Sequence, residues 1–116
     1  MVLELSKRQV DILVDVYEKT DGCKTGANSW QFSTSKKSES ELLQQVLVTS
    51  GYCCNLLERV RGKYVGYILS VNSRKESVVP SSKFETYFAE KNVWCLSVPN
   101  GNLIVRRKGK VHVTGN

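Results

Sequence analysis

The last twenty-four residues, 93–116, constrain the fold most strongly, because short apolar stretches alternate there with turn-forming residues. The three apolar stretches are Val93–Val98, Leu103–Val105 and Val111–Val113. A Pro-Asn-Gly-Asn turn and a basic turn separate them, at Pro99–Asn102 and Arg106–Lys110. Apolar runs of this length between turn residues are typical of β-strands. The pattern therefore predicts three consecutive strands at this end of the chain.

The opposite end of the chain begins with a helical pattern. Ser6 and Gln9 form the sequence signature of a capping box, and the apolar residues of one helical face follow: Val10, Leu13, Val14 and Tyr17. Ile12 and Val16 add a neighbouring stripe, which predicts that this helix is buried on more than one side. Asp21-Gly22 is expected to end the helix, with the glycine as its stop.

Residues 26–72 continue with strand, helix and hairpin patterns. A turn at Gly26–Asn28 precedes an alternating strand, whose inward residues are Trp30, Phe32 and Thr34. Ser38–Glu41 matches a second capping box, Gly51 is a stop signal, and the helical face between them is Leu42, Leu43, Val46 and Leu47. The stretches Tyr52–Val60 and Tyr64–Val71 then predict a hairpin around Arg61-Gly62-Lys63. The order helix, hairpin, helix, hairpin predicts an α+β fold with helices on one face of an antiparallel sheet.

Residues 93–116 resemble the C-terminal end of an intein, a self-splicing protein element. The matching segments are Val93–Val98, Asn102–Val105, Gly109–Val111 and Gly115-Asn116. The resemblance implies that this part forms β-strands of a Hint (intein) splicing domain. It also implies that Asn116 cyclises to a succinimide and so cuts the chain from the downstream flanking protein.

Other residues of the tail take their expected roles from the same resemblance. Cys95 stands where most of the family has Asp, but one intein class has Cys there, with a Thr that Thr114 matches. Cys95 is then a nucleophile for the upstream scissile bond or a proton-managing group beside it; otherwise it is a small buried strand residue. Gly115 occupies the place where the family usually has His. His112 is the one imidazole that could substitute for it, or else a half-exposed strand residue.

The chain begins with Met1 rather than Cys or Ser, and it lacks the Thr-x-x-His motif that activates the first scissile bond. We therefore expect it to be the C-terminal part of a split intein or a trimmed form of an intein. Its expected partners are a complementary N-terminal intein fragment and the host (extein) protein. Splicing of this kind needs no cofactor.

Residues 6–72 resemble one repeat of the LAGLIDADG homing endonucleases, through the order of their elements and the segment Leu13–Gly22. The resemblance implies that Asp21 binds a divalent metal, with Mg²⁺ required only if the repeat is active. Asp15 departs from the family, which often has a small residue there for close helix pairing. A second carboxylate would have to come from another copy, so Asp21 is alternatively an ordinary helix-ending turn residue.

Basic residues on the predicted hairpin, Arg59, Arg61 and Lys63, could follow the phosphate backbone of double-stranded DNA. They could equally protect a solvated sheet edge by their charge. A LAGLIDADG-type DNA-binding or homing-endonuclease module is therefore the alternative function of the chain.

Composition and boundaries complete the prediction. A hydrophobic content of 41% suits a modest core, and the net charge of +6 allows polyanionic partners. The chain has neither an apolar run of roughly 20 residues nor a signal-peptide layout, so we expect a cytoplasmic protein without a membrane partner. The expected parts are a LAGLIDADG-like repeat at 1–72, a linker at 73–92 and the splicing segment at 93–116. Within the linker, Phe84, Tyr87 and Phe88 are predicted to pack on the core.

Overall fold

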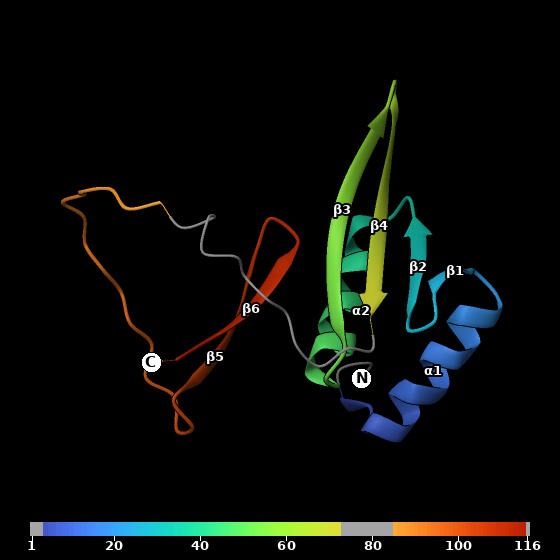
Figure 1. Cartoon of the computed structure of the whole chain (residues 1–116), viewed down its shortest axis with the longest axis horizontal. Coiled ribbons are helices and arrows are strands. Elements are labelled where there is room, and N and C mark those ends of the chain that lie inside the picture. The colour runs from blue at the N-terminus through green and yellow to red at the C-terminus, as the bar shows by residue number, and fades with distance from the viewer. Residues whose placement is uncertain (1–3, 73–84, 116) are drawn as a thin grey trace.

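The computed structural model describes residues 4–72 and 85–115, and this part of the chain forms two helices and six strands (Figure 1). In chain order the elements are α1 (Lys7–Lys19), β1 (Gly22–Gly26), β2 (Ser29–Thr34), α2 (Lys37–Thr49), β3 (Cys53–Arg61), β4 (Tyr64–Asn72), β5 (Asn102–Arg107) and β6 (Lys110–Gly115). The predicted α+β fold with the order helix, hairpin, helix, hairpin is confirmed. The α1–β1–β2–α2 arrangement resembles a LAGLIDADG-like unit. Neither helix is long and apolar enough to cross a membrane.

Helix α1 begins where the capping box predicts. The Ser6 hydroxyl accepts a hydrogen bond from the Gln9 backbone N–H, and the Gln9 side chain accepts one from the Ser6 backbone N–H. Val10 and Val14 are buried, as the helical spacing predicts. The prediction for the second stripe was wrong, because Ile12 and Val16 are 57% and 50% exposed. Only one face of α1 meets the sheet, and this stripe lies outside it.

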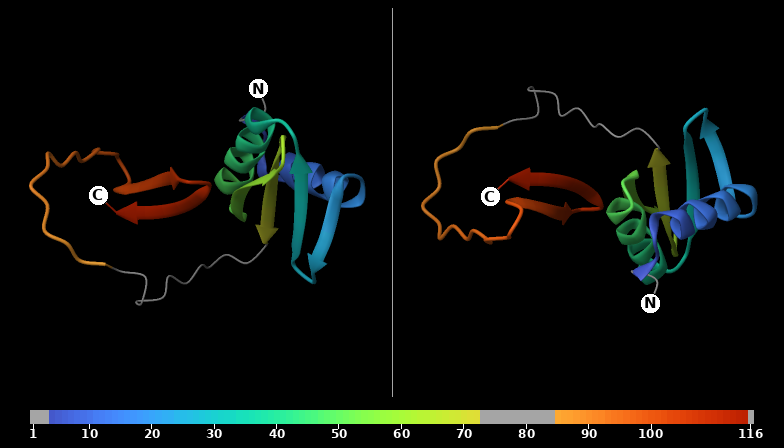
Figure 2. Two further views of the ribbon diagram at one scale, coloured as in Figure 1. Left: turned by 90° about the horizontal axis from the view of Figure 1, so that it is seen from above. Right: turned by 90° about the horizontal axis from the view of Figure 1, so that it is seen from below.

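Strands β1 to β4 form one antiparallel sheet in the order β1-β2-β4-β3, with both helices packed on the same face (Figure 2). Cross-strand pairing aligns Trp30 with Val71 and Phe32 with Leu69. The face that these residues share is buried against α1 and α2, and the core cluster is Val10, Val14, Trp30, Phe32, Leu43, Val46, Leu47, Cys54, Leu69 and Val71. We call residues 4–72 the helix–sheet unit.

Helix α2 differs from its sequence prediction at its beginning. It starts at Lys37 with Lys36 as its N-cap, so the capping box predicted at Ser38–Glu41 was wrong. Glu39 instead accepts a hydrogen bond from the Thr34 hydroxyl at the end of β2, 2.7 Å away. That hydroxyl also accepts a hydrogen bond from the Lys36 backbone N–H, which fixes the chain just before the helix.

The buried face and the end of α2 follow from its packing. Leu42 is 39% exposed, and Ser40 and Gln44 lie inside with Leu43, Val46 and Leu47. Gly51 ends the helix as predicted. It adopts a φ of +89°, and the Tyr52 N–H reaches back to the Leu47 carbonyl in a Schellman motif.

Strands β5 and β6 pair with each other as a separate antiparallel hairpin, which we call the C-terminal hairpin. Arg106 and Lys110 belong to the strands, so the predicted turn shrinks to Lys108 and Gly109. Both turn residues have positive φ values (49° and 76°), as a two-residue type I′ turn requires. The Pro99–Asn102 turn is confirmed by a hydrogen bond from the Gly101 N–H to the Val98 carbonyl.

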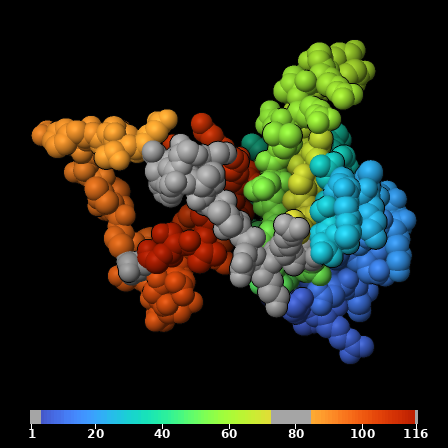
Figure 3. All heavy atoms as spheres, viewed as in Figure 1, coloured from blue at the N-terminus to red at the C-terminus, as the bar shows by residue number. Residues whose placement is uncertain are grey.

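The segment between the two parts has no regular secondary structure over its described residues, 85–98. The strand predicted at Val93–Val98 is therefore wrong, and the physical reason is that a strand needs a hydrogen-bonding neighbour. Tyr87 and Phe88 are 77% and 90% exposed, so they do not pack on the core as predicted. Phe84 and most of the predicted linker, 73–92, lie outside the described residues. Figure 3 shows the orange stretch of this segment standing clear of the helix–sheet unit.

Tyr52 provides a test of the hydrogen bond that joins α1 to the residue before β3. Its hydroxyl donates a 2.7 Å hydrogen bond to Asp11, and burial and this bond raise the pKa of Tyr52 to about 12. The folded chain therefore keeps this proton to a higher pH than the unfolded chain does. The stability that results is complete below pH 10 and is lost as the pH rises through about 12.

We expect Tyr52→Phe to lower the stability at pH 7 and to flatten its decline between pH 10 and 12. Urea unfolding followed across this pH range measures both effects. Tyr64→Phe is the matched control, because Tyr64 is 71% exposed at the far end of the β3–β4 hairpin. Equal curves for the two variants would contradict the expected role of Tyr52.

Candidate functional site

Strand β6 carries three of the predicted site residues. His112 and Thr114 lie two residues apart on one face of the strand, opposite Val105 and Leu103 of β5, and Gly115 follows. All three are exposed in the described part of the chain. An added Cβ at Gly115 would meet no heavy atom within 4 Å, so open space surrounds the position that precedes Asn116.

Cys95 and Asn116 lie apart from these three residues. Cys95 is exposed and belongs to the extended segment 85–98, which β5 separates from β6 along the chain. Its neighbour Trp94 is 90% exposed. Asn116 lies outside the described residues. The structure thus brings His112, Thr114 and Gly115 together on one strand and holds Cys95 on a different segment.

Sequence reasoning missed the residues that join the C-terminal hairpin to the helix–sheet unit. The Gly109 carbonyl accepts hydrogen bonds from the Leu56 backbone N–H at 2.9 Å and from the Gln44 side-chain amide at 2.8 Å. The Gln44 amide oxygen accepts a longer bond, 3.4 Å, from Arg106. The tip of the hairpin therefore rests on α2 and on the edge strand β3 (Figure 2). A polar residue three positions before Leu47, at helical spacing from it, was the one available signal.

Two cysteines of the unit occupy opposite faces of β3. The Cys54 thiol is buried and lies 3.7 Å from the Gln44 backbone carbonyl, to which it donates. Burial raises the pKa of Cys54 to about 12, with a smaller contribution from neighbouring Cys53. The thiolate, not the thiol, is the nucleophile. Cys54 is therefore chemically quiet at neutral pH, in contrast to exposed Cys95 and Cys23.

Asp21 is an exposed residue in the turn between α1 and β1. Among the described residues, no three His, Cys, Asp or Glu side chains gather closely enough to hold a metal ion. One exposed carboxylate does not fit a magnesium site, which requires several converging oxygens. Gly22 has a role in packing, because a Cβ there would lie 2.6 Å from the Tyr17 carbonyl oxygen. Its small size lets β1 start directly against the end of α1.

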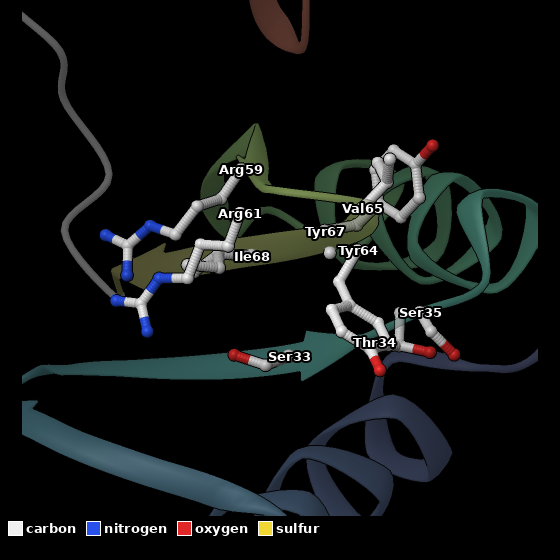
Figure 4. A pocket seen from close by; sticks show the side chains of 10 residues that line it. Ser33, Thr34, Ser35, Arg59, Arg61, Tyr64, Val65, Tyr67 and Ile68 are labelled. Carbon is white, nitrogen blue, oxygen red and sulfur yellow. The ribbon is translucent and has the colours of Figure 1, made fainter.

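Arg59 and Arg61 lie on one face of β3 and line a shallow hollow of about 440 Å³ with Ser33 and Tyr64. Figure 4 shows their side chains extending side by side in the same direction. Lys63 lies in the adjoining turn, with its ammonium 5.6 Å from the Tyr64 ring centroid. The predicted basic residues thus share one end of the β3–β4 hairpin.

Comparison with protein-family models, with curated proteins and with solved structures finds no match to this chain.

The difference between the thiols gives a direct test of the site geometry. We expect an alkylating reagent at pH 8 to modify Cys95 and Cys23 at least tenfold faster than Cys54, because both are exposed whereas Cys54 is buried and protonated. Peptide mapping by mass spectrometry after timed quenching measures the rates. Unfolding in urea should make the rates similar. Rapid labelling of Cys54 in the native chain would contradict the described packing.

Proposed function

We propose that the chain is the C-terminal splicing segment of an intein. It acts with an N-terminal intein segment, which either precedes it in the same polypeptide or is a separate chain. The single observation that carries this proposal is the exposure of apolar side chains around the tail. Val93, Trp94 and Leu96 are 91%, 90% and 68% exposed. Ile104 and Val113 on the C-terminal hairpin are 57% and 70% exposed. Large apolar residues that are exposed on an unpaired segment and on a hairpin with open strand edges are typical of a surface that another segment covers.

The proposed reaction at the downstream junction is intramolecular. The side-chain amide nitrogen of Asn116 attacks its own backbone carbonyl carbon, and the bond from that carbon to the next residue breaks. The downstream amine leaves with a proton, and a succinimide remains on this chain. An amide nitrogen is a weak nucleophile, so the site must orient it and polarise the carbonyl. His112 is the imidazole available for this proton transfer, since Gly115 supplies no side chain.

Cys95 acts in the proposal at the upstream junction. Its thiolate attacks the upstream scissile carbonyl, the peptide nitrogen leaves with a proton, and the upstream segment is then held as a thioester. In this proposal Thr114, two residues before Asn116 in the sequence, supplies a hydroxyl to the site. This role agrees with the exposure of Cys95 on an extended segment whose strand neighbours would come from the N-terminal segment.

The experiment for Asn116 uses the chain with a small reporter protein fused after it, mixed with an N-terminal intein segment of the Cys-carrying class. We expect release of the reporter and a chain one water lighter than its Asn-terminated form, measured by intact mass spectrometry. Asn116→Ala should abolish release, whereas Asn55→Ala, at an exposed position on β3, should leave it unchanged. Undiminished release from Asn116→Ala would rule out the proposed function.

In the same assay, the N-terminal segment carries an upstream flank and the reporter begins with Cys, Ser or Thr, whose side chain accepts the acyl group from Cys95. Cys95→Ala should prevent joining of the two flanks. Cys23→Ala is the matched control, because Cys23 is also exposed but lies on β1 of the helix–sheet unit.

A second candidate function, binding of double-stranded DNA by the helix–sheet unit, is supported by the paired Arg59 and Arg61 side chains. If both contact phosphates, replacing them with Gln should lower the slope of log affinity against log salt by about two. Gel shifts at several salt concentrations measure the slope. Arg8→Gln, at an exposed position of α1, is the control. An unchanged slope would leave these arginines as protection for the sheet edge.

A further inference from the structure

The C-terminal hairpin has little of its own to hold it in place. It consists of two six-residue strands, and no residue of it is buried among those described. An isolated two-stranded hairpin is at best marginally stable in water. Its orientation therefore depends on the few contacts that its tip makes with the helix–sheet unit.

Gln44 is placed to make the central contact. Its side chain is 1% exposed, although it lies on the face of α2 that otherwise buries Leu43 and Leu47. One amide hydrogen goes to the Cys54 carbonyl at 3.3 Å, the other to the Gly109 carbonyl at 2.8 Å. The oxygen accepts from Arg106. The hydrogen-bonding capacity of this buried amide is satisfied only when the hairpin is docked.

The hairpin side of the contact is equally specific. The Gly109 carbonyl uses both of its lone pairs, for Gln44 and for the Leu56 N–H. A Cβ at position 109 would collide with the Leu56 carbonyl oxygen, so only glycine allows this approach. The Arg106 guanidinium also lies 3.9 Å from the Glu41 carboxylate, so the same arginine contacts a second residue of α2.

We propose that Gln44 and Gly109 form a clamp that positions β6, and that the helix–sheet unit thereby acts as a scaffold for the splicing segment. This inference rests on the proposed function. Strand β6 starts at Lys110, directly after the clamped glycine, and carries His112 and Thr114 toward its far end, roughly 17 Å away by strand geometry. Because the tip of the hairpin is held in place, the direction of β6 is set, and with it the positions of His112 and Thr114 relative to the helix–sheet unit. Gln44 is a positioning residue in this account, since it touches no reacting atom.

The first measurement follows docking without any splicing partner. In the full chain, the Leu56 amide should exchange with solvent at least tenfold faster in Gly109→Ala than in wild type, because its acceptor is displaced. Gly101→Ala is the matched control. Gly101 also has a positive φ, of 67°, and lies before the same hairpin, but a Cβ there meets no atom within 4 Å. The Leu69 amide, inside the sheet, should exchange equally slowly in all three chains.

The second measurement is reporter release from Asn116 in the same variants. Gly109→Ala and Gln44→Leu should each lower the release rate roughly tenfold at an unchanged unfolding midpoint of the helix–sheet unit. Gln31→Leu is the control for Gln44, because it removes a side-chain amide bonded to Ser70 without touching the hairpin. Gln44→Leu also leaves the Cys54 carbonyl unpaired. If this variant unfolds, the release rate of Gly109→Ala alone tests the positioning role.

The outcomes separate this inference from the proposed function. Unchanged Leu56 exchange in Gly109→Ala would overturn the clamp, and lost protection with full release would overturn its positioning role. A wild-type chain that releases no reporter would overturn the proposed function and with it the role in release. Exchange at Leu56 would still decide whether the clamp exists.

Discussion

The burial of one sheet face beneath two helices is the constraint on which the rest of the structure depends. Leu47 of α2 and Leu69 of β4 expose no surface, and they pack in one cluster with Trp30 and Phe32 of β2. Burying a side chain of this size contributes about 2 kcal/mol. Residues 4–72 therefore have a core of their own. Residues 85–115 contain no buried hydrophobic side chain and must take their order from elsewhere.

Two sources of order are open to the C-terminal hairpin. One is the helix–sheet unit, which it meets through hydrogen bonds of Gly109 and Arg106. Hydrogen bonds of this kind fix direction well, but each adds only about 1 kcal/mol of net stability. The other source is a further segment that pairs with the open strand edges and covers the exposed apolar residues. On the proposed function that segment is the N-terminal part of the intein. The helix–sheet unit then orients the hairpin, and the N-terminal part supplies the missing strand neighbours.

Local patterns carried most of what the sequence could predict. Three predicted features depend only on residues near one another in the chain, and the structure has all three. They are the capping box at Ser6, the inward-facing Trp30 and Phe32 of an alternating strand, and the turn at Pro99–Asn102. Val93–Val98 has the composition of a strand but lacks a pairing neighbour in the described chain, and composition alone cannot supply one. Gln44 was missed for a similar reason, because its partner Gly109 lies 65 residues further along.

The candidate site divides in the same way. Motif resemblance selects Asn116, Cys95 and Thr114, whereas their arrangement depends on contacts that no local pattern encodes. In the structure His112 and Thr114 are surrounded by solvent on an uncovered strand face. An asparagine amide cyclises slowly unless neighbouring groups orient it and polarise the carbonyl. On the proposed function, an associating segment therefore has to cover β6, exclude water and bring Cys95 into the same site.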